Sequence, residues 1–323
     1  MYEDMDKCYV LIKISIRDFY MKVFVTGVNG QLGFETVKEL SARGIECVGS
    51  DISDAFCGEV EAFSGFSYIK LDITDRKQVL DVITKINPDA VIHPAGWTAV
   101  DSAEEPGNRE MVFDVNEKGT EYIAEACSKI SSKMLYISTD YVFDGHGSEP
   151  WKPDDKNFNP LSVYGASKLA GEKAVARLTD KFFIVRISWA FAINGNNFVR
   201  TMLNIAQRHD TVRVVNDQIG TPTYMHDLAR LLVDMIETDR YGYYHATNEG
   251  GFISWYDFAV EIYRQTGKNI KVIPVSTDEY GYSKAIRPKN SRLDKSKLAE
   301  AGFEPLPDWK DALSRYLDEY HKR

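Results

Sequence analysis

The stretch KVFVTGVNGQLG, residues 22–33, decides the fold of this chain. Its first half, KVFVT, is rich in β-branched and aromatic residues and predicts a strand over residues 22–26. Its second half is a glycine loop that leads into a helical pattern over residues 31–43. A glycine loop between a strand and a helix is typical of dinucleotide binding, because the amide groups and the positive dipole end of the helix face the phosphates.

Three glycines in this loop follow the spacing GxxGxxG. Gly27 permits a tight turn, Gly30 lets the backbone approach a pyrophosphate, and Gly33 allows the helix to pack closely on the sheet. The loop therefore predicts a site for a nicotinamide dinucleotide, with cofactor contacts expected from Gly27, Asn29, Gly30, Gln31, Leu32 and Gly33.

The alternation of strands and helices continues after this loop. Further strands are expected over residues 45–50, 66–70, 90–93, 133–138 and 182–187. Helices are expected between them, over residues 75–86, 109–129 and 160–178. Because short right-handed βαβ connections leave few other topologies, the pattern predicts an α/β fold with a doubly wound parallel sheet of the Rossmann type.

The pattern divides the chain into three parts. Residues 1–20 precede the first strand and are expected to be an N-terminal extension. Residues 21–188 carry the regular alternation and form the predicted dinucleotide-binding domain. After residue 189 the alternation loosens, which indicates a smaller mixed α/β lobe over residues 189–323 that mainly binds the substrate, with some chain crossing between the lobes.

The composition is that of a globular protein that binds small molecules. The 323 residues are 44% hydrophobic and 27% charged, and a net charge of -9 argues against nucleic-acid and anionic-membrane partners. The first twenty residues resemble neither a signal peptide nor a membrane span. Because the four cysteines and six histidines lack metal-ligand spacing, we expect no metal, and reduced thiols in the cytoplasm.

Acidic and small residues follow the next three predicted strands. Asp51 ends the second strand, where a carboxylate accepts hydrogen bonds from a ribose diol and repels a 2′-phosphate, so NAD is favoured over NADP. Asp72 and Ile73 follow the third strand and are expected beside the adenine, although Asp72 alternatively caps a turn. Ala95 and Gly96 follow the fourth strand and are expected to pass under the cofactor.

A second motif lies near the middle of the chain. Tyr164 and Lys168 stand four residues apart on a predicted helix and therefore share one face. We expect the ammonium group to lower the Tyr164 pKa, to bind the nicotinamide ribose and to make Tyr164 a proton donor near neutral pH. Thr139, at the carboxyl end of a strand, is expected to hydrogen-bond a substrate carbonyl. These three residues predict the catalytic set of a hydride-transferring oxidoreductase, the alternative being a solvated Tyr/Lys pair.

Several segments between residue 21 and the C-terminus narrow the family. They are TAVDSAE (98–104), STDYVFDG (138–145), YGASK (164–168), DQIGTPT (217–223) and RPKNSRLD (287–294). Together they resemble the dTDP-4-dehydrorhamnose reductase family of the short-chain dehydrogenase/reductase superfamily. Related dehydratases carry Asp-Glu after the threonine, whereas Asp140 and Tyr141 follow Thr139 here, so the acid/base pair for water elimination is missing.

The resemblance implies reduction of the C4 ketone of dTDP-4-dehydro-L-rhamnose to dTDP-L-rhamnose with NADH or NADPH. It also implies substrate contacts from Thr98, Val100, Thr139, Trp189 and Arg287. Trp189 would present a ring face to the sugar methyl group, the alternative being a packing role alone. Arg287 would meet the substrate pyrophosphate, the alternative being an ordinary surface arginine.

Two other functions stay open at this point. One is a reductase or epimerase acting on another nucleotide sugar, and the other is a regulatory subunit similar to that of methionine adenosyltransferase. The intact Thr139, Tyr164 and Lys168 set favours catalysis over regulation. Residues 190–192 read AFA where the family usually has a hydrophobic residue, Tyr and Gly, which puts the shape of the sugar pocket in question. A homodimer is a further expectation.

Overall fold

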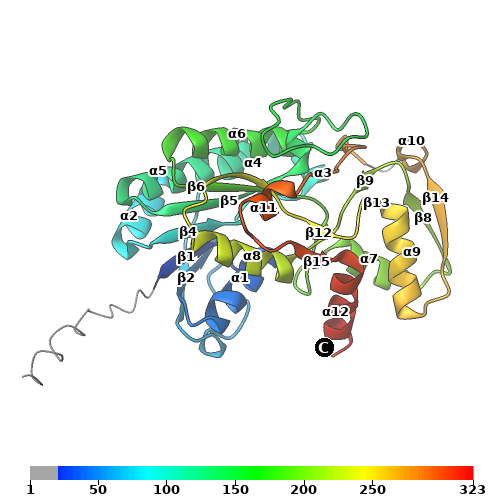
Figure 1. Ribbon diagram of the computed structural model, residues 1–323, viewed down its shortest axis with the longest axis horizontal. Helices are drawn as coiled ribbons and strands as arrows, with labels where there is room; N and C mark the ends of the chain where they lie inside the picture. Colours follow the sequence, from blue (N-terminus) through cyan, green and yellow to red (C-terminus); the bar gives the residue numbers. More distant parts are fainter. Residues whose placement is uncertain (1–20, 282, 323) are drawn as a thin grey trace, which may run out of the picture.

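A seven-stranded parallel sheet forms the centre of the protein (Figure 1). The computed structural model describes residues 21–281 and 283–322, so the predicted extension over residues 1–20 lies outside the described residues. The strands of the sheet are β1 (Lys22–Thr26), β2 (Glu46–Asp51), β3 (Phe66–Lys70), β4 (Ala90–His93), β5 (Lys133–Thr139), β6 (Phe182–Ile187) and β11 (Gly242–His245). Their order is β11-β6-β5-β4-β1-β2-β3, with every neighbouring pair parallel.

The doubly wound α/β fold predicted from the sequence is confirmed, and β1 to β6 match the six predicted strands. The seventh strand, β11, was not expected. Its sequence, GYYH, is only four residues long and begins with glycine, so it carries no clear periodicity. It pairs with β6, which means that the chain returns to the sheet long after residue 189.

Helices cover both faces of the sheet (Figure 1). On one face lie α1 (Gln31–Ala42) and α8 (Met225–Ile236), which pack on each other. On the other face lie α2 (Arg76–Ile86), α5 (Thr120–Ile130) and α6 (Val163–Leu178). The alternation within β1 serves both cores, because Val23 and Val25 pack on the α1/α8 side and Phe24 packs on the other.

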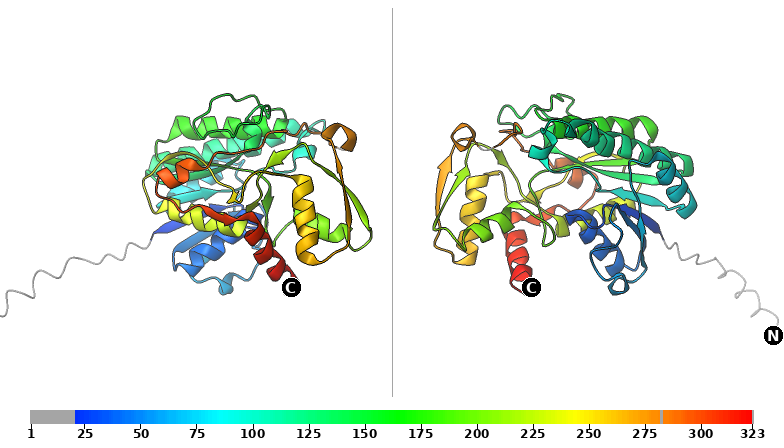
Figure 2. Two further views of the ribbon diagram at one scale, coloured as in Figure 1. Left: turned by 45° about the vertical axis from the view of Figure 1, so that its right-hand side comes forward. Right: turned by 180° about the vertical axis from the view of Figure 1, so that it is seen from behind.

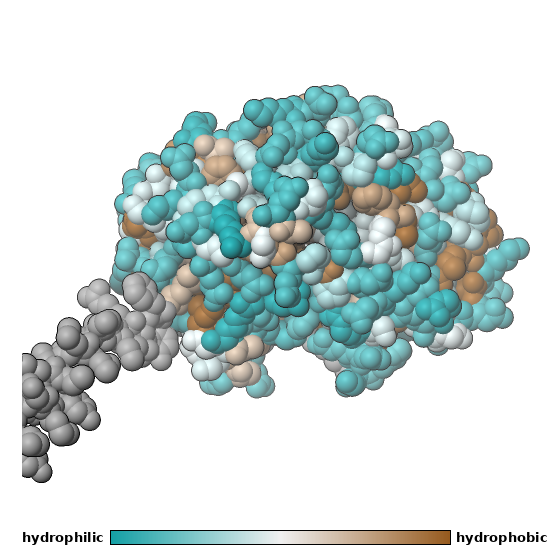
Figure 3. Space-filling view, viewed as in Figure 1, coloured by the Kyte–Doolittle hydropathy of each residue, from teal (hydrophilic) through white to brown (hydrophobic). Residues whose placement is uncertain are grey.

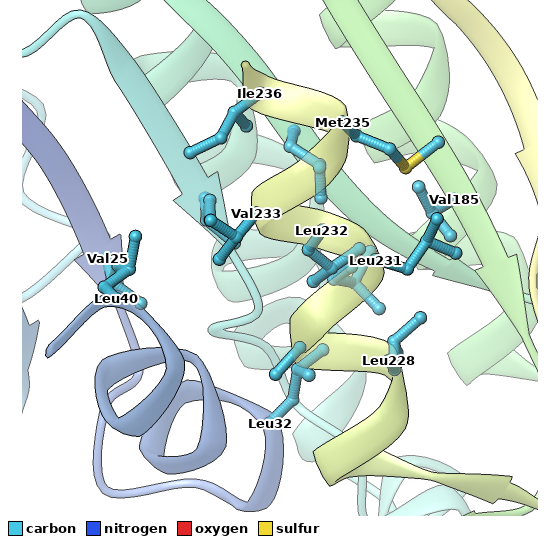
Figure 4. Packing of buried hydrophobic residues seen from close by; sticks show 14 of the residues in the cluster. Val25, Leu32, Leu40, Val185, Leu228, Leu231, Leu232, Val233, Met235 and Ile236 are labelled. Carbon is cyan, nitrogen blue, oxygen red and sulfur yellow. The ribbon is translucent and has the colours of Figure 1, made fainter. Parts of the chain in front are cut away.

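Helix α8 anchors the core on the α1 side of the sheet. Its Leu228 and Leu232 are fully buried. Figure 4 shows α8 with Leu32 and Leu40 of α1 on one side and Val185 of β6 on the other. A helix from far along the chain thus packs beside the first helix on the same face of the sheet, which ties residues 225–236 to the sheet half of the molecule.

The helix predicted over residues 109–129 is instead divided. It consists of α4 (Asn108–Phe113), a π-helical turn η2 (Asp114–Gly119) and then α5. A π-helical turn widens the backbone spiral locally, and such turns are frequently found at functional sites. The short helix α3 (Val100–Ala103) and the 3-10 turns η1 (Val60–Ala62) and η3 (Asp140–Val142) complete this half of the chain.

The remaining elements are shorter and lie mainly at one end of the sheet, and we call them the C-terminal lobe (Figure 2). Its strands are β7 (Ala190–Phe191), β8 (Thr211–Val215), β9 (Ile219–Gly220), β10 (Thr223–Tyr224), β12 (Asn248–Glu249), β13 (Ile253–Ser254), β14 (Lys271–Val275) and β15 (Leu306–Asp308). Its helices are α7 (Phe198–Ile205), α9 (Trp255–Thr266), α10 (Thr277–Tyr280) and α12 (Trp309–His321), while α11 (Ser296–Glu300) lies against β11. The strands pair only two by two, and an aromatic-rich core of Phe191, Phe258, Trp309 and Tyr316 holds them together.

The sheet has one topological switch point, between β1 and β4. The chain runs outward from β1 to β2 and β3 on one side, and from β4 to β5, β6 and β11 on the other. Ligands of doubly wound sheets bind outside the carboxyl ends of the strands at such a point. Figure 3 shows a mainly hydrophilic surface on one face, and within the described residues no helix is long and apolar enough to span a membrane.

Candidate active site

A cavity of about 810 Å³ lies at the switch point, and it brings together most of the predicted site residues. Residues from the glycine loop, the ends of β2 to β5, helix α6 and the segment after β6 line it. The predicted site residues among them are Gly27, Gly30, Gln31, Leu32, Gly33, Asp51, Asp72, Ile73, Ala95, Gly96, Thr98, Val100, Thr139, Tyr164, Lys168 and Trp189. Asn29 and Arg287 are the two predicted site residues that do not line the cavity.

The glycine loop is packed so tightly that larger residues do not fit. Gly27 has a φ of 62°, and a Cβ there would lie 2.8 Å from the Ala95 Cα atom. A Cβ on Gly33 would overlap the Gly27 carbonyl oxygen. The Gly30 amide donates to the same oxygen at 3.0 Å, and Gly30 caps α1. The loop therefore brings the first turn of α1 to the cavity wall without intervening side chains.

Asn29 braces this loop instead of lining the cavity. Its backbone amide donates to Asp51 Oδ2 at 3.2 Å, and its side chain donates to the Ala55 carbonyl at 3.0 Å and accepts from the Cys57 amide at 2.8 Å. The other Asp51 oxygen accepts hydrogen bonds from the amide and hydroxyl of Ser53. These bonds hold the Asp51 carboxylate at the end of β2, on the cavity wall.

Asp72 caps a turn and also lines the cavity. Asp72 Oδ1 accepts from the Thr74 amide at 2.9 Å and from its hydroxyl at 2.7 Å, so the residue caps a turn. The same residue lines the cavity together with Ile73. The Ile73 side chain also fills the space beside Gly119 in the π-helical turn, where a Cβ would lie 3.0 Å from it.

Helix α6 places Tyr164 and Lys168 on the cavity wall. Ser162 caps this helix by accepting from the Gly165 amide at 3.1 Å. Gly165 packs directly on the Tyr141 carbonyl oxygen, where a Cβ would clash, so the first turn of α6 rests on η3, which directly follows β5. Thr139 Oγ1 donates to Asp140 Oδ1 at 3.0 Å and forms a side-chain hydrogen bond with Tyr164. The three predicted catalytic residues thus meet in one place.

The expected lowering of the Tyr164 pKa is wrong for this structure. Burial raises the pKa of Tyr164 above its ordinary value despite the hydrogen bond with Thr139, and the charge of Asp140 adds to the rise. The spacing of the Tyr/Lys motif shows which residues meet, but it does not show how completely they are removed from water. A tyrosine with a raised pKa stays protonated at neutral pH and is available as a proton donor.

Burial also changes the charge state of the neighbouring groups. Lys168 is 5% exposed, and burial lowers its pKa to about 7, although the charge of Glu172 acts in the opposite direction. Its Nζ atom lies 4.0 Å from the centre of the Tyr136 ring. Burial raises the pKa of Asp140 to about 6, although hydrogen bonds from Ser291 and Thr139 favour its charged form. Asp140 lines the cavity and was not predicted as a site residue.

Asn116 is a further residue that sequence reasoning missed. It lies in the π-helical turn and is fully buried. Its Oδ1 atom accepts from the Trp97 amide at 2.7 Å, and its Nδ2 atom donates to the Trp97 carbonyl at 3.1 Å and to Ser167 Oγ at 2.9 Å. Asn116 thus joins the segment after β4 to helix α6. An asparagine within a predicted helix, where it is a poor helix former, was the available signal.

Trp189 stands between the sheet and the C-terminal lobe. Its φ of 51° is rare for a bulky residue, and this strained backbone turns the chain out of β6. The indole stacks on Trp255 of α9, with ring centres 3.8 Å apart. Of the atypical segment 190–192, the exposed Ala190 lines the cavity and the buried Phe191 packs into the lobe core.

Arg287 is engaged outside the cavity. Its Nη2 atom donates to Asp101 Oδ2 at 2.6 Å, and its Nη1 atom donates to Asp101 Oδ1 at 3.1 Å. The amides of Lys284 and Ala285 donate to the same carboxylate.

The described residues contain no group of three or more His, Cys, Asp or Glu that could hold a metal ion.

Comparison with known proteins identifies the family. The model of the RmlD substrate binding domain matches residues 21–322. The dTDP-4-dehydrorhamnose reductase of Aggregatibacter actinomycetemcomitans is 38% identical over 90% of this chain and 97% of its own. The spore coat polysaccharide biosynthesis protein SpsK of Bacillus subtilis is 36% identical over 92% of this chain and 97% of its own.

Solved structures agree with this assignment. A dTDP-4-dehydrorhamnose reductase from Clostridium acetobutylicum superposes with a TM-score of 0.84 and 40% identity, over 93% of this chain and 100% of that one. The reductase from Bacillus anthracis in complex with NADP has a TM-score of 0.82 and 37% identity, over 93% of this chain and 99% of that one. With the resemblance seen in its sequence motifs thus confirmed, this chain belongs to the dTDP-4-dehydrorhamnose reductase family.

Proposed function

We propose that this protein reduces the C4 ketone of dTDP-4-dehydro-L-rhamnose to give dTDP-L-rhamnose, using NADH or NADPH. The observation that carries this proposal is the meeting of Thr139, Tyr164 and Lys168 beside the glycine loop, in one cavity of a chain of this family. A cavity of about 810 Å³ lies within the range of small-molecule and cofactor sites.

The residues present fit a nicotinamide dinucleotide. Gly27 and Gly33 have no Cβ, which would collide with the backbone of Ala95 and of Gly27, so the loop folds tightly and brings the N-terminus of α1 to the wall of the cavity. Asp51 at the end of β2 supplies a carboxylate for a ribose diol, and Lys168 supplies a donor for the second ribose. When bound, the reduced cofactor supplies the hydride.

The protein's own groups would donate the proton and stabilise the developing negative charge. Tyr164 would donate its hydroxyl proton to the O4 atom of the sugar, since its raised pKa keeps it protonated until the alkoxide develops. Thr139 would hydrogen-bond the same oxygen, and the Lys168 ammonium group would stabilise the tyrosinate that remains. A positioned proton donor of this kind accelerates a reaction by roughly 10²- to 10⁴-fold.

Finer parts of the proposal concern the cofactor and the assembly. Asp51 favours NADH over NADPH, because its carboxylate repels a 2′-phosphate. The region after residue 189 would bind most of the sugar nucleotide, and Thr98, Val100 and Trp189 would surround the sugar. Arg287 would give up its ion pair with Asp101 and bind the pyrophosphate of the substrate instead.

The protein would act as a homodimer. The mass measured by light scattering in solution would test this expectation.

One assay tests the central proposal directly. Purified protein is mixed with dTDP-4-dehydro-L-rhamnose and NADH or NADPH, and the loss of cofactor absorbance and the sugar product are followed. Turnover with at least one cofactor is expected. Folded protein that binds the cofactor but gives no turnover would favour the regulatory alternative. Preferred turnover of another 4-keto nucleotide sugar would favour the alternative substrate, and Ala190 would then be the first residue to exchange.

A further inference from the structure

Behind the cavity lies a buried set of charged groups that the proposed reaction does not use. Glu172 and Arg186 form an ion pair in which both residues are at most 2% exposed. Arg186 Nε donates to Glu172 Oε1 at 2.8 Å, and Nη2 donates to Oε2 at 2.7 Å. Burying two charges is costly, and such a pair often contributes less to stability than apolar residues of similar size. Stability alone therefore does not explain this buried pair.

The pair is connected to the catalytic residues through Glu172. Glu172 lies four residues after Lys168 on α6, which places the two side chains on one face of the helix. The Ser138 hydroxyl donates to Glu172 Oε1 at 2.5 Å, and Ser138 directly precedes Thr139. Glu172 therefore contacts strand β5 beside one catalytic residue and shares a helix face with another.

Arg186, which binds the Glu172 carboxylate, is itself fixed by several neighbours. Its Nη1 atom donates to the Pro153 carbonyl at 3.0 Å and lies 3.3 Å from His245 Nε2. Its guanidinium group also stacks on aromatic rings, those of Phe143, Phe158 and Tyr243. Because these contacts come from several elements, the carboxylate is held rigidly.

The other groups that face Lys168 do not offer it a negative charge. His93 of β4 is buried and has a pKa lowered to about 3 by burial and by Lys168 itself, so it is neutral. Tyr136 of β5 and Tyr164 of α6 both have pKa values raised by burial and are also neutral. Glu172 is the one negative charge among the described residues that acts on Lys168.

We propose that Glu172 is a positioning residue that keeps the buried Lys168 ammonium group charged and holds helix α6 against Ser138 of strand β5. The role of Glu172 rests on the proposed function only because that function assigns Lys168 its role in the reaction. The charge of Lys168 itself is measurable in the protein without substrate or cofactor. Loss of the Lys168 charge would weaken the binding of the nicotinamide ribose and the stabilisation of the Tyr164 anion.

The test is the titration of Lys168 in Glu172→Gln protein. Lysine side chains are labelled with ¹³C at the ε-carbon and followed by NMR as the pH changes, and the Lys168 signal is assigned by its absence in Lys168→Met. Removing the negative charge should lower the Lys168 pKa by about 1 unit, the lower end of the effect of a close opposite charge. The dissociation constant for NADH, measured against pH by fluorescence, should begin to rise at a correspondingly lower pH.

Two comparison variants separate this role from a structural one. Asp227 is also buried and forms a bidentate pair with Arg315 at 2.7 and 2.8 Å, away from the cavity. Asp227→Asn should destabilise the protein but leave the Lys168 titration at its native position. Glu172→Asp, which retains the charge, should restore most of the native titration.

A buried arginine without its partner can prevent folding, so a second variant is needed. Glu172→Gln combined with Arg186→Gln removes both charges, and it should again lower the Lys168 pKa because Glu172 is the member of the pair whose charge acts on Lys168. A native Lys168 titration in either folded variant would overturn the proposal. This outcome does not depend on turnover, so it is distinguishable from a failure of the proposed function.

Discussion

The two halves of the molecule position their site residues by different means. In the sheet half, Thr139 ends a seven-residue strand, and Tyr164 and Lys168 begin a sixteen-residue helix, so long regular elements hold them. In the C-terminal lobe, Trp189 is held by an aromatic stack and by strands of two residues. Hydrogen-bonded ladders resist displacement more than a stack of side chains does. The predicted reacting groups therefore lie on long regular elements, whereas Trp189, one of the residues expected near the sugar, depends on the packing of side chains.

This difference predicts where substitutions should act. Changes in the sheet half should alter turnover or cofactor binding, because its residues surround the reacting atoms and the glycine loop. Changes in the C-terminal lobe should alter the apparent affinity for the sugar nucleotide with little effect on cofactor.

Tyr164→Phe removes one hydroxyl group and retains the ring that packs against Tyr141. Turnover should fall by roughly 10²- to 10⁴-fold, the contribution of a positioned general acid, while the dissociation constant for NADH stays nearly native. Steady-state kinetics and fluorescence titration measure the two quantities. The matched control is Tyr244→Phe, which loses a hydroxyl bonded to the Arg240 carbonyl away from the cavity and should keep native turnover.

Near-native turnover of Tyr164→Phe would break the assignment, and a water molecule or another side chain would then have to supply the proton. Lys168→Met should differ from Tyr164→Phe in kind. Because the ammonium group is predicted to serve both the ribose and the tyrosinate, this variant should lose turnover and cofactor affinity together.

Asp51→Ala should weaken NADH binding by about 10- to 100-fold, since a hydrogen bond to a charged group contributes about 1.5 to 3 kcal/mol. NADPH binding should weaken less, because the lost carboxylate also repelled its 2′-phosphate. The KM for the sugar nucleotide should stay native. Equal losses for NADH and NADPH in calorimetric titrations would remove Asp51 from the ribose site.

Trp255→Leu tests the other half of the comparison. Trp255 does not line the cavity but stacks on Trp189, which does. An aromatic pair contributes about 0.5 to 1.5 kcal/mol, so the KM for the sugar nucleotide should rise by roughly 2- to 10-fold with an unchanged dissociation constant for NADH. A weakened affinity for NADH instead would show that the two halves are not separate in function.

The same contrast explains what could be predicted from the sequence. The glycine loop, Thr139 and the Tyr164/Lys168 pair are short local patterns on regular elements, and the structure places them as expected around one cavity. β11 was missed because four residues carry too little pattern, although the sheet pairs it readily with β6.

Contacts across long stretches of chain were beyond such patterns. Asp101 and Arg287 are 186 residues apart and pair outside the cavity, and Glu172 meets Ser138 across 34 residues. The Tyr164 pKa was misjudged for a related reason, because burial depends on every element that surrounds the helix. Motif spacing predicts which groups meet, whereas dielectric surroundings require the folded structure.

The smallest predicted effect concerns the contact between α1 and α8, the two helices that pack on each other on one face of the sheet. The buried Glu35 accepts from His226 Nδ1 at 3.1 Å and also pairs with Lys38 at 3.0 Å. The hydrogen bond with Glu35 raises the pKa of His226 although burial opposes it. A histidine with a raised pKa stabilises the fold below its unfolded pKa of about 6.5, and this stability is lost as the pH rises through the folded value.

His226→Gln should therefore lower the free energy of unfolding mainly at acidic pH. The difference should be only about 0.5 kcal/mol, because the His226 side chain is 48% exposed and solvent screens its charge. Urea unfolding of both proteins at about pH 6 and about pH 8.5 measures it. The difference should shrink at the higher pH, where Lys38 alone continues to pair with Glu35. A difference that grows with pH would mean that neutral His226 is the stabilising form, and turnover should be native in either case because His226 does not line the cavity.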